Sequence, residues 1–183
     1  MAQRIGVISD THIAGEPGEL FAPLARLWGE IDLILHAGDV TSPLVIAALE
    51  RIAPTTVVAG NVDGAMGAAM WPRTAVVSLG HFAIGLTHGD LRPVFDMRSP
   101  PQWRSSGRFD AATLHAYLRS QFPPVDAIVF GHTHRPHNAV DKGILFFNPG
   151  AFAKRYGHEA SRMVGVLTLD THGIHGEHIR WQD

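Results

Sequence analysis

The chain contains no cysteine. This absence excludes disulfide bonds, thiolate metal sites and catalysis by a thiol nucleophile. The chain also lacks any apolar run close to the ~20 residues that a membrane-spanning helix requires. Residues 5–9 enter a strand pattern with no signal peptide before them. We therefore expect a cytoplasmic protein without membrane association.

The chain also has no large excess of positive or negative charge. Fifteen Lys and Arg stand against 17 Asp and Glu, for a net charge of −2, so we expect no strong binding to nucleic acid or anionic membranes. Hydrophobic residues occupy 45% of the 183 positions, which is typical of a globular chain. The length, without repeats or linkers, predicts one domain over residues 1–183. The chain is rich in histidine, with 12, and histidine is the commonest metal ligand.

The first sixty residues alternate between strand and helix patterns. Strands are predicted at residues 5–9, 31–37 and 55–59, and helices at residues 20–28 and 43–51. Such alternation favours parallel strands joined by crossover helices. In sheets of this kind, ligands gather beyond the carboxyl ends of the strands.

The rest of the chain follows a different pattern. Residues 74–79 and 81–86 predict a hairpin with Gly80 at its turn. One further helix and four further strands are predicted at residues 110–121, 125–130, 144–147, 163–170 and 173–181. The mixture of parallel and antiparallel strands predicts an α/β fold of two packed sheets with helices outside.

Polar side chains that can bind a metal follow the first three strands. Asp10 and His12 are two residues apart, and residues at that spacing in an extended segment point to the same side, so both can reach one ion. Asp39 and Asn61 each follow a glycine directly after a strand. A turn or a helix cap explains each of these features equally well when it is taken alone.

Histidines complete the set of candidate ligands. His88 ends the second strand of the hairpin, where a single histidine is more often structural or exposed. His132 and His134 flank Thr133 after an apolar strand, so their imidazoles form a pincer on one side of the loop. Four other histidines lie in polar C-terminal segments and are expected at the surface: His158, His172, His175 and His178.

The joint placement of these residues predicts a site for two divalent metal ions. Its ligands are nitrogen or oxygen donors, which suit Mn²⁺, Fe, Zn²⁺, Ni²⁺ or Co²⁺, and of these we expect manganese. A carboxylate shared by two cations about 3.5–4 Å apart offsets their repulsion, and Asp39 is the candidate for this role. The seven predicted ligands are Asp10, His12, Asp39, Asn61, His88, His132 and His134.

The order of these motifs resembles that of the calcineurin-like metallophosphoesterases. The matching string is Asp10-Xaa-His12, Gly38-Asp39, Gly60-Asn61, His88-Gly89 and Gly131-His132-Xaa-His134. The similarity extends from about residue 5 to residue 150. The small size, Arg135-Pro136 after the last histidine and Asn148-Pro149-Gly150 are most similar to the compact phosphodiesterase subfamily of bacteria and archaea. The retromer subunit of the same fold belongs to this group.

This resemblance implies a four-layer αββα sandwich of two mixed β-sheets flanked by helices. It also implies how the ligands divide between two metal positions. The first position would be held by Asp10, His12 and His134. The second would be held by Asn61, His88 and His132, with Asp39 as the bridge.

The resemblance further implies a hydrolase in which a metal-bound hydroxide attacks the phosphorus of a small phosphate ester. A phosphodiesterase is expected more than a phosphomonoesterase. The expected catalytic residues are Asp39, Asn61 and His88. The expected substrate contacts are Arg135 and Asn61.

Position 62 departs from the pattern of the larger family. Many of its members have a histidine there, which acts as a general acid, whereas this chain has Val62. General acid catalysis typically contributes about 10²–10⁴-fold, so we predict a preference for good leaving groups such as aryl phosphates. Asp63 is a candidate substitute for the acid.

Three alternatives to a phosphodiesterase remain. One is a phosphomonoesterase, and another is an interaction module that keeps the fold but has weak activity. The third is a regulatory or storage protein that binds a single metal ion per chain. The complete set of ligands favours an enzyme. Exposed hairpins are compatible with a homodimer.

Overall fold

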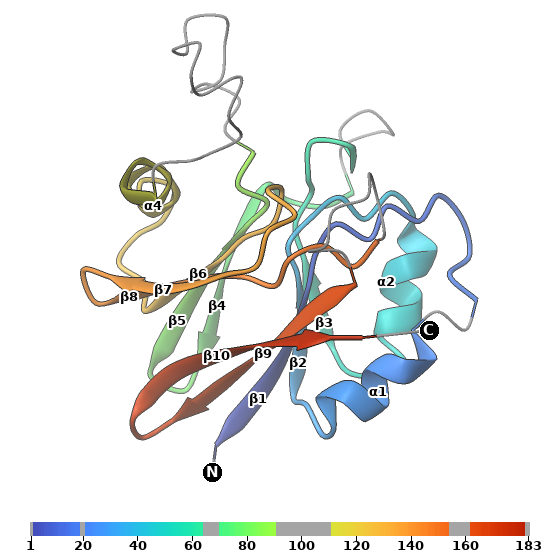
Figure 1. Ribbon diagram of the computed structural model, residues 1–183, viewed down its shortest axis with the longest axis horizontal. Coiled ribbons are helices and arrows are strands. Elements are labelled where there is room, and N and C mark those ends of the chain that lie inside the picture. Colours follow the sequence, from blue (N-terminus) through green and yellow to red (C-terminus); the bar gives the residue numbers. More distant parts are fainter. Residues whose placement is uncertain (1, 19–20, 64–69, 91–110, 154–161, 182–183) are drawn as a thin grey trace, which may run out of the picture.

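The computed structural model describes residues 2–18, 21–63, 70–90, 111–153 and 162–181. Its strands form two five-stranded mixed sheets that lie against each other (Figure 1). Three described helices cover the outer faces of these sheets.

The first sheet contains the alternating segment of the chain. Its strand order is β10-β9-β1-β2-β3, in which β1, β2 and β3 are parallel and β9 runs antiparallel to β1. β9 and β10 pair as a hairpin. The bounds are β1 Gln3–Ile8, β2 Leu33–His36, β3 Thr55–Val57, β9 Met163–Asp170 and β10 Gly173–Arg180.

The second sheet has the strand order β4-β5-β6-β8-β7. Its three central strands, β5, β6 and β8, are parallel, and the edge strands β4 and β7 are antiparallel to their neighbours. Gly80 has a φ of 61° in the turn between β4 and β5, which confirms the predicted hairpin. The bounds are β4 Thr74–Leu79, β5 Phe82–Thr87, β6 Ala127–Val129, β7 His137–Asp141 and β8 Ile144–Asn148.

Helices form the two outer layers (Figure 1). Helices α1 (Ala22–Trp28) and α2 (Pro43–Leu49) pack their apolar faces against the first sheet. Ser42 caps α2, because its Oγ accepts the N–H of Leu44 at 3.3 Å, and Pro43 fits the first turn. Helix α4 (Ala111–Arg119) packs Leu114 and Leu118 against the second sheet. The expected four-layer αββα sandwich is confirmed.

A core of apolar side chains lies between the two sheets. Each fully buried aliphatic or aromatic side chain contributes about 1.5–3 kcal/mol to stability, and residues of both sheets take part. They include Ile5, Val7 and Leu35 from the first sheet and Ile84, Leu86 and Phe147 from the second. This core fixes the two sheets relative to each other and therefore fixes the loops at their ends.

Strand β7 is the one described strand that the sequence pattern missed. Its residues, His137 to Asp141, alternate between partly buried and exposed positions at the edge of the second sheet. Polar residues dominate this stretch, so it has no apolar run to indicate a strand. The predicted first helix also begins later than expected, at Ala22.

The carboxyl ends of the central strands determine where the predicted ligands lie. Register pairs Ile8 of β1 with His36 of β2, and His36 with Val57 of β3, so these three strands end together. In the second sheet, Leu86 of β5 pairs with Val129 of β6. The loops that follow these five strands therefore leave the sheets at neighbouring places.

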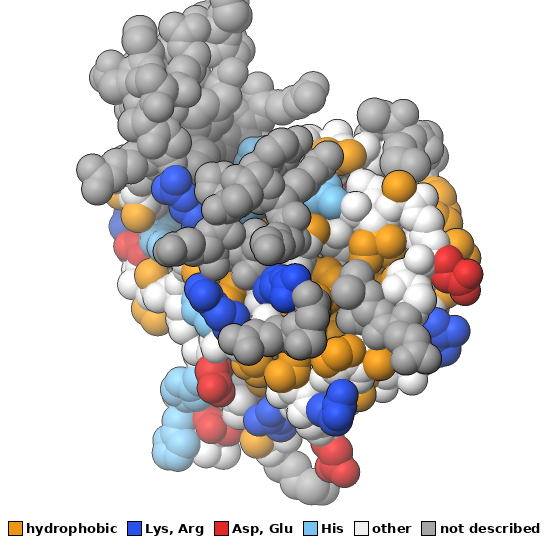
Figure 2. All heavy atoms as spheres, turned by 45° about the vertical axis from the view of Figure 1, so that its right-hand side comes forward, with side chains coloured by type: hydrophobic (Ala, Val, Ile, Leu, Met, Phe, Trp, Pro, Cys, Tyr) orange, Lys and Arg blue, Asp and Glu red, His pale blue; other side chains and the backbone are white. Residues whose placement is uncertain are grey.

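The surface of the described residues carries charges of both signs. On the face shown in Figure 2, acidic and basic side chains are interspersed among hydrophobic and uncharged ones. This agrees with the small net charge of −2. No helix among the described residues is both long and apolar enough to cross a membrane.

Candidate metal centre

The loops that follow five strands of the two sheets meet in one place. The N–H of Gly131 donates to the carbonyl of His88 at 3.1 Å, and the Nδ1–H of His88 donates to the carbonyl of Ala37 at 2.7 Å. The two sheets are therefore connected directly at this edge. The loops bring together all seven predicted ligands: Asp10, His12, Asp39, Asn61, His88, His132 and His134.

The backbone of these loops is strained. Eight described non-glycine residues have a positive φ, and five of them are predicted ligands. Such a conformation costs about 1–3 kcal/mol for each residue and persists where the surrounding structure enforces it. The five residues and their φ angles are Asp10 (54°), His12 (49°), Asp39 (55°), His132 (65°) and His134 (56°). The strain indicates that these loops are shaped to aim side chains, because folding alone would favour glycine or an extended backbone here.

The first group of donors consists of Asp10, His12 and His134. Nε2 of His134 lies 3.1 Å from Oδ1 of Asp10, and the Nε2 atoms of His12 and His134 are 3.5 Å apart. One donor atom from each residue lies within 4.8 Å of the others, which is a spacing that a single ion could satisfy. The structure thus brings together the expected ligands of the first metal position.

The second group is centred on the side-chain oxygen of Asn61. This Oδ1 atom lies 3.1 Å from Nε2 of His88 and 2.9 Å from Nδ1 of His132. The His88 and His132 rings meet edge to face, with centroids 5.2 Å apart. All three side chains therefore converge on one point, as expected for the second metal position.

Asp39 lies between the two groups and offers one oxygen to each. Its Oδ2 lies 3.6 Å from Nε2 of His12, and its Oδ1 lies 3.4 Å from Nε2 of His88. Donor atoms of Asp10, Asp39 and His88 also lie within 4.8 Å of one another. Asp10 is therefore placed closer to the second group than the sequence suggested, and the two groups form one continuous cluster.

The donor set fits divalent metal ions. Oδ1 of Asp10 is buried and accepts no hydrogen bond from any described residue, and a buried carboxylate oxygen without a partner is costly. Two donors bound to one ion at about 2.0–2.2 Å lie roughly 3 Å apart, which matches the shortest separations in both groups. The donors are imidazole nitrogens, carboxylate oxygens and one amide oxygen, all suited to first-row divalent metals.

Protons balance the carboxylate charges within the protein itself. Burial alone would raise the pKa of Asp39, but the neighbouring His88 holds it down to about 2. Burial would conversely lower the pKa of His88, yet Asp39 and Asp10 raise it to about 9. At neutral pH His88 is thus protonated opposite Asp39. A metal ion must displace this proton, so metal binding would release protons and depend on pH.

The same balance operates in the first group. Contact with Asp10 raises the pKa of His134 despite partial burial of the imidazole. Burial would raise the pKa of Asp10, and His134 and His88 together keep it below its usual value. Burial lowers the pKa of His132, aided by the nearby positive charge of His88. His132 is therefore ready to donate a lone pair without first losing a proton.

Two glycines allow the loops to approach this closely. A Cβ atom on Gly60 would lie 2.1 Å from Oδ1 of Asp39, and one on Gly131 would lie 2.9 Å from Oδ2 of Asp10. Neither position has room for a side chain. Gly60 and Gly131 precede Asn61 and His132 in the sequence, so the absence of their side chains places the next residue against a carboxylate.

Asp63 braces the loops through contacts with their backbone amides. Its Oδ2 accepts the N–H groups of Gly60 at 2.7 Å and Val40 at 3.3 Å, and its Oδ1 accepts the N–H of Thr41 at 2.8 Å. Both carboxylate oxygens are thus engaged with backbone amides at a buried position. These contacts give Asp63 a structural role, and its service as a general acid in place of a histidine at position 62 stays a prediction.

His36 is a supporting residue that the sequence pattern did not single out. Its Nδ1 accepts the N–H of Gly38 at 3.2 Å, so the proton lies on Nε2, which faces Thr11 Oγ1 at 3.2 Å. Burial lowers the pKa of His36 to about 4, and the ring is neutral at neutral pH. A histidine at a buried position of an apolar strand is the signal that could have identified it. His36 links the loop of Asp10 to the loop of Asp39.

Asn148 fixes the loop that carries His132 and His134. Its Nδ2 donates to the carbonyl of Gly131 at 2.7 Å, and its Oδ1 accepts the N–H of Gly150 at 2.9 Å. Ser9 Oγ lies 2.7 Å from both the carbonyl of Gly150 and Oδ2 of Asp10. The Asn148-Pro149-Gly150 motif therefore holds the first strand's loop and the histidine loop together.

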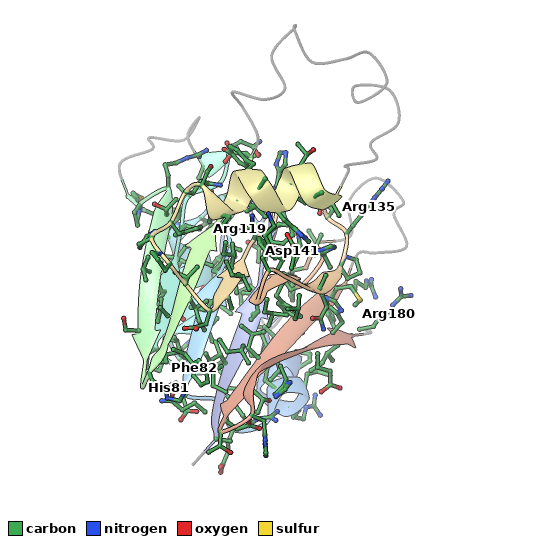
Figure 3. All side chains as sticks on the ribbon, turned by 90° about the vertical axis from the view of Figure 1, so that its left-hand side faces the viewer. His81, Phe82, Arg119, Arg135, Asp141 and Arg180 are labelled. Atoms are coloured by element: carbon green, nitrogen blue, oxygen red, sulfur yellow. The ribbon has the colours of Figure 1, made fainter. Side chains whose placement is uncertain are left out.

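The other predicted site residues lie beside this cluster. Arg135 is exposed and projects outward from the body of the protein (Figure 3), so its contact with substrate stays a prediction. Val62 is half-buried, and its backbone N–H donates to Oδ1 of Asp39 at 3.0 Å. Residue 62 therefore lies against the carboxylate of Asp39, although its side chain has no proton to transfer.

Histidines near the C-terminus follow the surface prediction only in part. His172 and His175 are exposed as expected. His178 is partly buried, stacks on Phe147 with ring centroids 4.8 Å apart, and has Nε2 2.8 Å from the carbonyl of Asn148. The surface prediction for His178 is wrong, because β10 turns this side chain toward β8. His158 lies outside the described residues.

The sequence of the chain matches one family model along most of its length. Residues 3–172 match the calcineurin-like phosphoesterase superfamily domain. The chain belongs to the calcineurin-like phosphoesterase superfamily. A protein named "Probable metallophosphoesterase" from Methanothermobacter thermautotrophicus is 34% identical to it over 176 residues, which cover 96% of this chain and 91% of the relative.

Solved structures agree with this family. A predicted phosphoesterase from Streptococcus pneumoniae superimposes with a TM-score of 0.67 at 25% identity, covering 98% of this chain and 90% of that one. A novel archaeal phosphodiesterase has the same fold, with a TM-score of 0.64 at 20% identity and coverage of 97% and 100%. The metallophosphoesterase fold and its donor cluster thus occur together in this chain.

Proposed function

We propose that this metallophosphoesterase is a dinuclear phosphodiesterase that hydrolyses small phosphate esters. The observation that carries the proposal is the position of Asp39. Its two carboxylate oxygens face two separate groups of nitrogen and oxygen donors, at 3.6 and 3.4 Å. A carboxylate in this position suits a pair of divalent cations better than a single ion, because one oxygen can serve each cation. Manganese is the metal we propose.

The protein's part in such a reaction is to hold the donors in place. Bound metals would lower the pKa of water and neutralise the charge of the phosphoryl group. The Nδ1–H of His88 is fixed on the carbonyl of Ala37, so Nε2 always faces Asn61 and Asp39. This contact determines which nitrogen is available to a metal, as outer contacts commonly do in metalloenzymes.

The proposed catalytic residues are those at the centre of the cluster: Asp39, Asn61 and His88. Asn61 has a neutral oxygen between two imidazoles, and we propose that Asn61 contacts both a metal and a phosphate oxygen. Arg135 directly follows the histidine pair and is exposed. Its planar guanidinium suits a phosphate group, and we propose that it binds the substrate from the rim of the centre.

A diester substrate is favoured over a monoester by similarity. The archaeal relative that shares the fold is described as a phosphodiesterase. Val62 supplies no general acid beside Asp39, so the departing oxygen must leave without a proton from this position. We therefore propose that diesters with good leaving groups are the best substrates.

One experiment tests this function. The purified protein is stripped of metal, restored with Mn²⁺, and assayed with a bis-aryl phosphate and with the matching mono-aryl phosphate. Asp39→Asn and His132→Ala are compared with His172→Gln, which changes an exposed histidine outside the cluster. We expect Mn²⁺-dependent turnover, faster on the diester, that both cluster variants abolish and His172→Gln retains.

Three outcomes would contradict the proposal in different ways. Faster hydrolysis of the monoester would favour a phosphomonoesterase. Metal binding without turnover of either substrate would favour an interaction module. Turnover that Asp39→Asn does not change would exclude the donor cluster as the active site.

A further inference from the structure

Arg73 links the two loops that carry Asn61 and His88. It is not one of the seven donors, so metal binding does not by itself explain its position. Its Nη1 donates to the carbonyl of Gly60 at 2.9 Å. Its Nη2 is paired with a carboxylate oxygen of Asp90. Gly60 directly precedes Asn61, and Asp90 follows His88 by two residues. One guanidinium thus holds the backbone of one ligand loop and a side chain of the other.

Both ends of this link are anchored. The N–H of Ala59 donates to the carbonyl of Pro72 at 2.8 Å, which fixes the segment before Arg73 against the loop of Asn61. At the other end, Tyr117 of α4 donates its hydroxyl to the carbonyl of Asp90 at 3.3 Å. Asp90 is buried, whereas the Arg73 side chain is 54% exposed. Asp90 is therefore held in place by burial and by its backbone hydrogen bond, and its pairing with Arg73 fixes the guanidinium relative to the loop of His88.

Gly60 makes the cluster sensitive to this link. Its Cα lies so close to Asp39 that an added Cβ would meet Oδ1 of Asp39 at 2.1 Å. A small shift of the Gly60 backbone would therefore move Asn61 relative to both Asp39 and His88. The Oδ1 to Nε2 distance between Asn61 and His88, 3.1 Å in the structure, depends on the separation of the two loops that Arg73 spans.

We propose that Arg73, through Asp90, is a positioning residue that sets the geometry of the second metal position and leaves the first unaffected. The proposal rests on the proposed function insofar as the cluster must bind two metals. Arg73 contacts the loops of Asn61 and His88, two of the three expected ligands of the second position. The ligands of the first position, Asp10, His12 and His134, follow β1 and β6, which Arg73 does not contact in the described residues.

The test is calorimetric titration of the metal-stripped full-length protein with Mn²⁺. Wild type is compared with Arg73→Met, Arg73→Lys and Arg119→Met. Arg119, the last residue of α4, is the matched control, because it also pairs with an aspartate, Asp141 at 2.7 Å, but this partner lies in β7 and not in a ligand loop (Figure 3). Thermal unfolding and the Mn²⁺ dependence of turnover are measured on the same samples.

We expect wild type to bind two ions. In Arg73→Met the first ion binds with unchanged affinity, and the second binds roughly 10–100-fold more weakly, the usual effect of removing an outer contact of a metal ligand. High Mn²⁺ restores turnover, so the half-saturating metal concentration rises while kcat at saturation stays near the wild-type value. The affinity of Arg73→Lys for the second ion lies between those of wild type and Arg73→Met, because an ammonium group lacks the planar fork that holds both loops. Arg119→Met binds both ions as wild type does.

Two results would overturn the proposal: unchanged binding of both ions in Arg73→Met, or equal weakening of both ions together with a lower Tm. If Arg73→Met does not fold, Asp90→Asn replaces it. That variant removes the charge of the pair and keeps the backbone contact with Tyr117, and it must show the same selective weakening. If wild type binds two ions without turnover, the proposed function fails while calorimetry still decides the role of Arg73. If wild type binds no ion, both fail.

Discussion

Nε2 of His134 lies 3.1 Å from Oδ1 of Asp10, yet this oxygen accepts no hydrogen bond from any described residue. The two atoms are close without pointing at each other as donor and acceptor. Such an arrangement suits two lone pairs directed at a common third atom. Asp10 follows β1 and His134 follows β6, 124 positions later in the sequence. The fold thus brings the two residues together around a shared partner.

Added metal should stabilise the folded protein through this pair. We predict that saturating Mn²⁺ raises the Tm of the stripped protein, because a ligand at 100 times its Kd contributes about 2.7 kcal/mol. His134→Ala should lose much of this increase, since one donor of the first group is removed. Differential scanning fluorimetry with and without Mn²⁺ measures the increase in Tm of each variant, and His172→Ala is the control. Equal stabilisation of both variants would contradict the assignment of His134.

The buried amide of Asn148 should contribute to the stability of the folded protein. Asn148→Ala leaves the carbonyl of Gly131 and the N–H of Gly150 without their partner, and each unsatisfied buried group costs about 1–3 kcal/mol. Asn138→Ala is a suitable control, because Asn138 also donates to a carbonyl, that of Gly176 at 2.7 Å, but from an exposed position. Chemical denaturation should show a large loss for Asn148→Ala and a small one for Asn138→Ala. Similar losses would show that Asn148 has no special role.

Acid should destabilise the metal-free protein through His36. Burial lowers its folded pKa to about 4 from 6.5, so folding favours the neutral ring. Its contribution is complete above pH 6.5 and is lost as the pH falls toward 4, by on the order of 3 kcal/mol. His88, whose pKa is raised to about 9, does not change its contribution in this range.

The measurement for His36 is urea denaturation of the metal-free protein between pH 7 and pH 4. His36→Asn keeps an acceptor near the N–H of Gly38 but does not titrate. We expect a lower stability at pH 7 than wild type and a flatter dependence on pH. A pH dependence as steep as that of wild type would exclude His36 as the source.

Leaving-group preference should respond to a change at position 62. The backbone N–H of Val62 already holds Oδ1 of Asp39, so Val62→His adds an imidazole without removing that bond. We predict that the rate on alkyl phosphodiesters rises relative to aryl ones by about tenfold or more, a part of the 10²–10⁴-fold that a general acid typically contributes. Val62→Gln, polar but unable to donate a proton as an acid, is the control. An unchanged alkyl-to-aryl ratio in Val62→His would show that residue 62 does not face the leaving group.

Much of the fold could be predicted from the sequence, because its strands are apolar and short and end at polar motifs. Strand β7 could not, since an edge strand needs no apolar run and His137 to Asp141 has none. That the seven candidate ligands lie together could be predicted because each follows a strand end. Their division into two groups on either side of Asp39 was implied by the family resemblance, and the distances agree with it. Only the structure shows that Asp10 also lies close to Asp39 and His88, because loops of different sheets meet there.

The supporting residues were harder to predict for a physical reason. Asp63 and Asn148 act through backbone amides and carbonyls of loops distant in sequence, and no spacing rule indicates such contacts. His36 looks like part of an apolar strand. Arg73 precedes β4 with no motif around it, and only its contacts with Gly60 and Asp90 reveal its place.

The most direct test of the central claim is the activity of the stripped protein as Mn²⁺ is added in known equivalents. Hydrolysis of a bis-aryl phosphate and bound metal are measured in the same samples. A dinuclear centre bridged by Asp39 predicts little turnover at one equivalent of Mn²⁺ and full turnover at two. In Asp39→Asn it predicts that no second ion binds and that turnover is lost. Full activity with one bound ion per chain, or turnover that needs no metal, would contradict it.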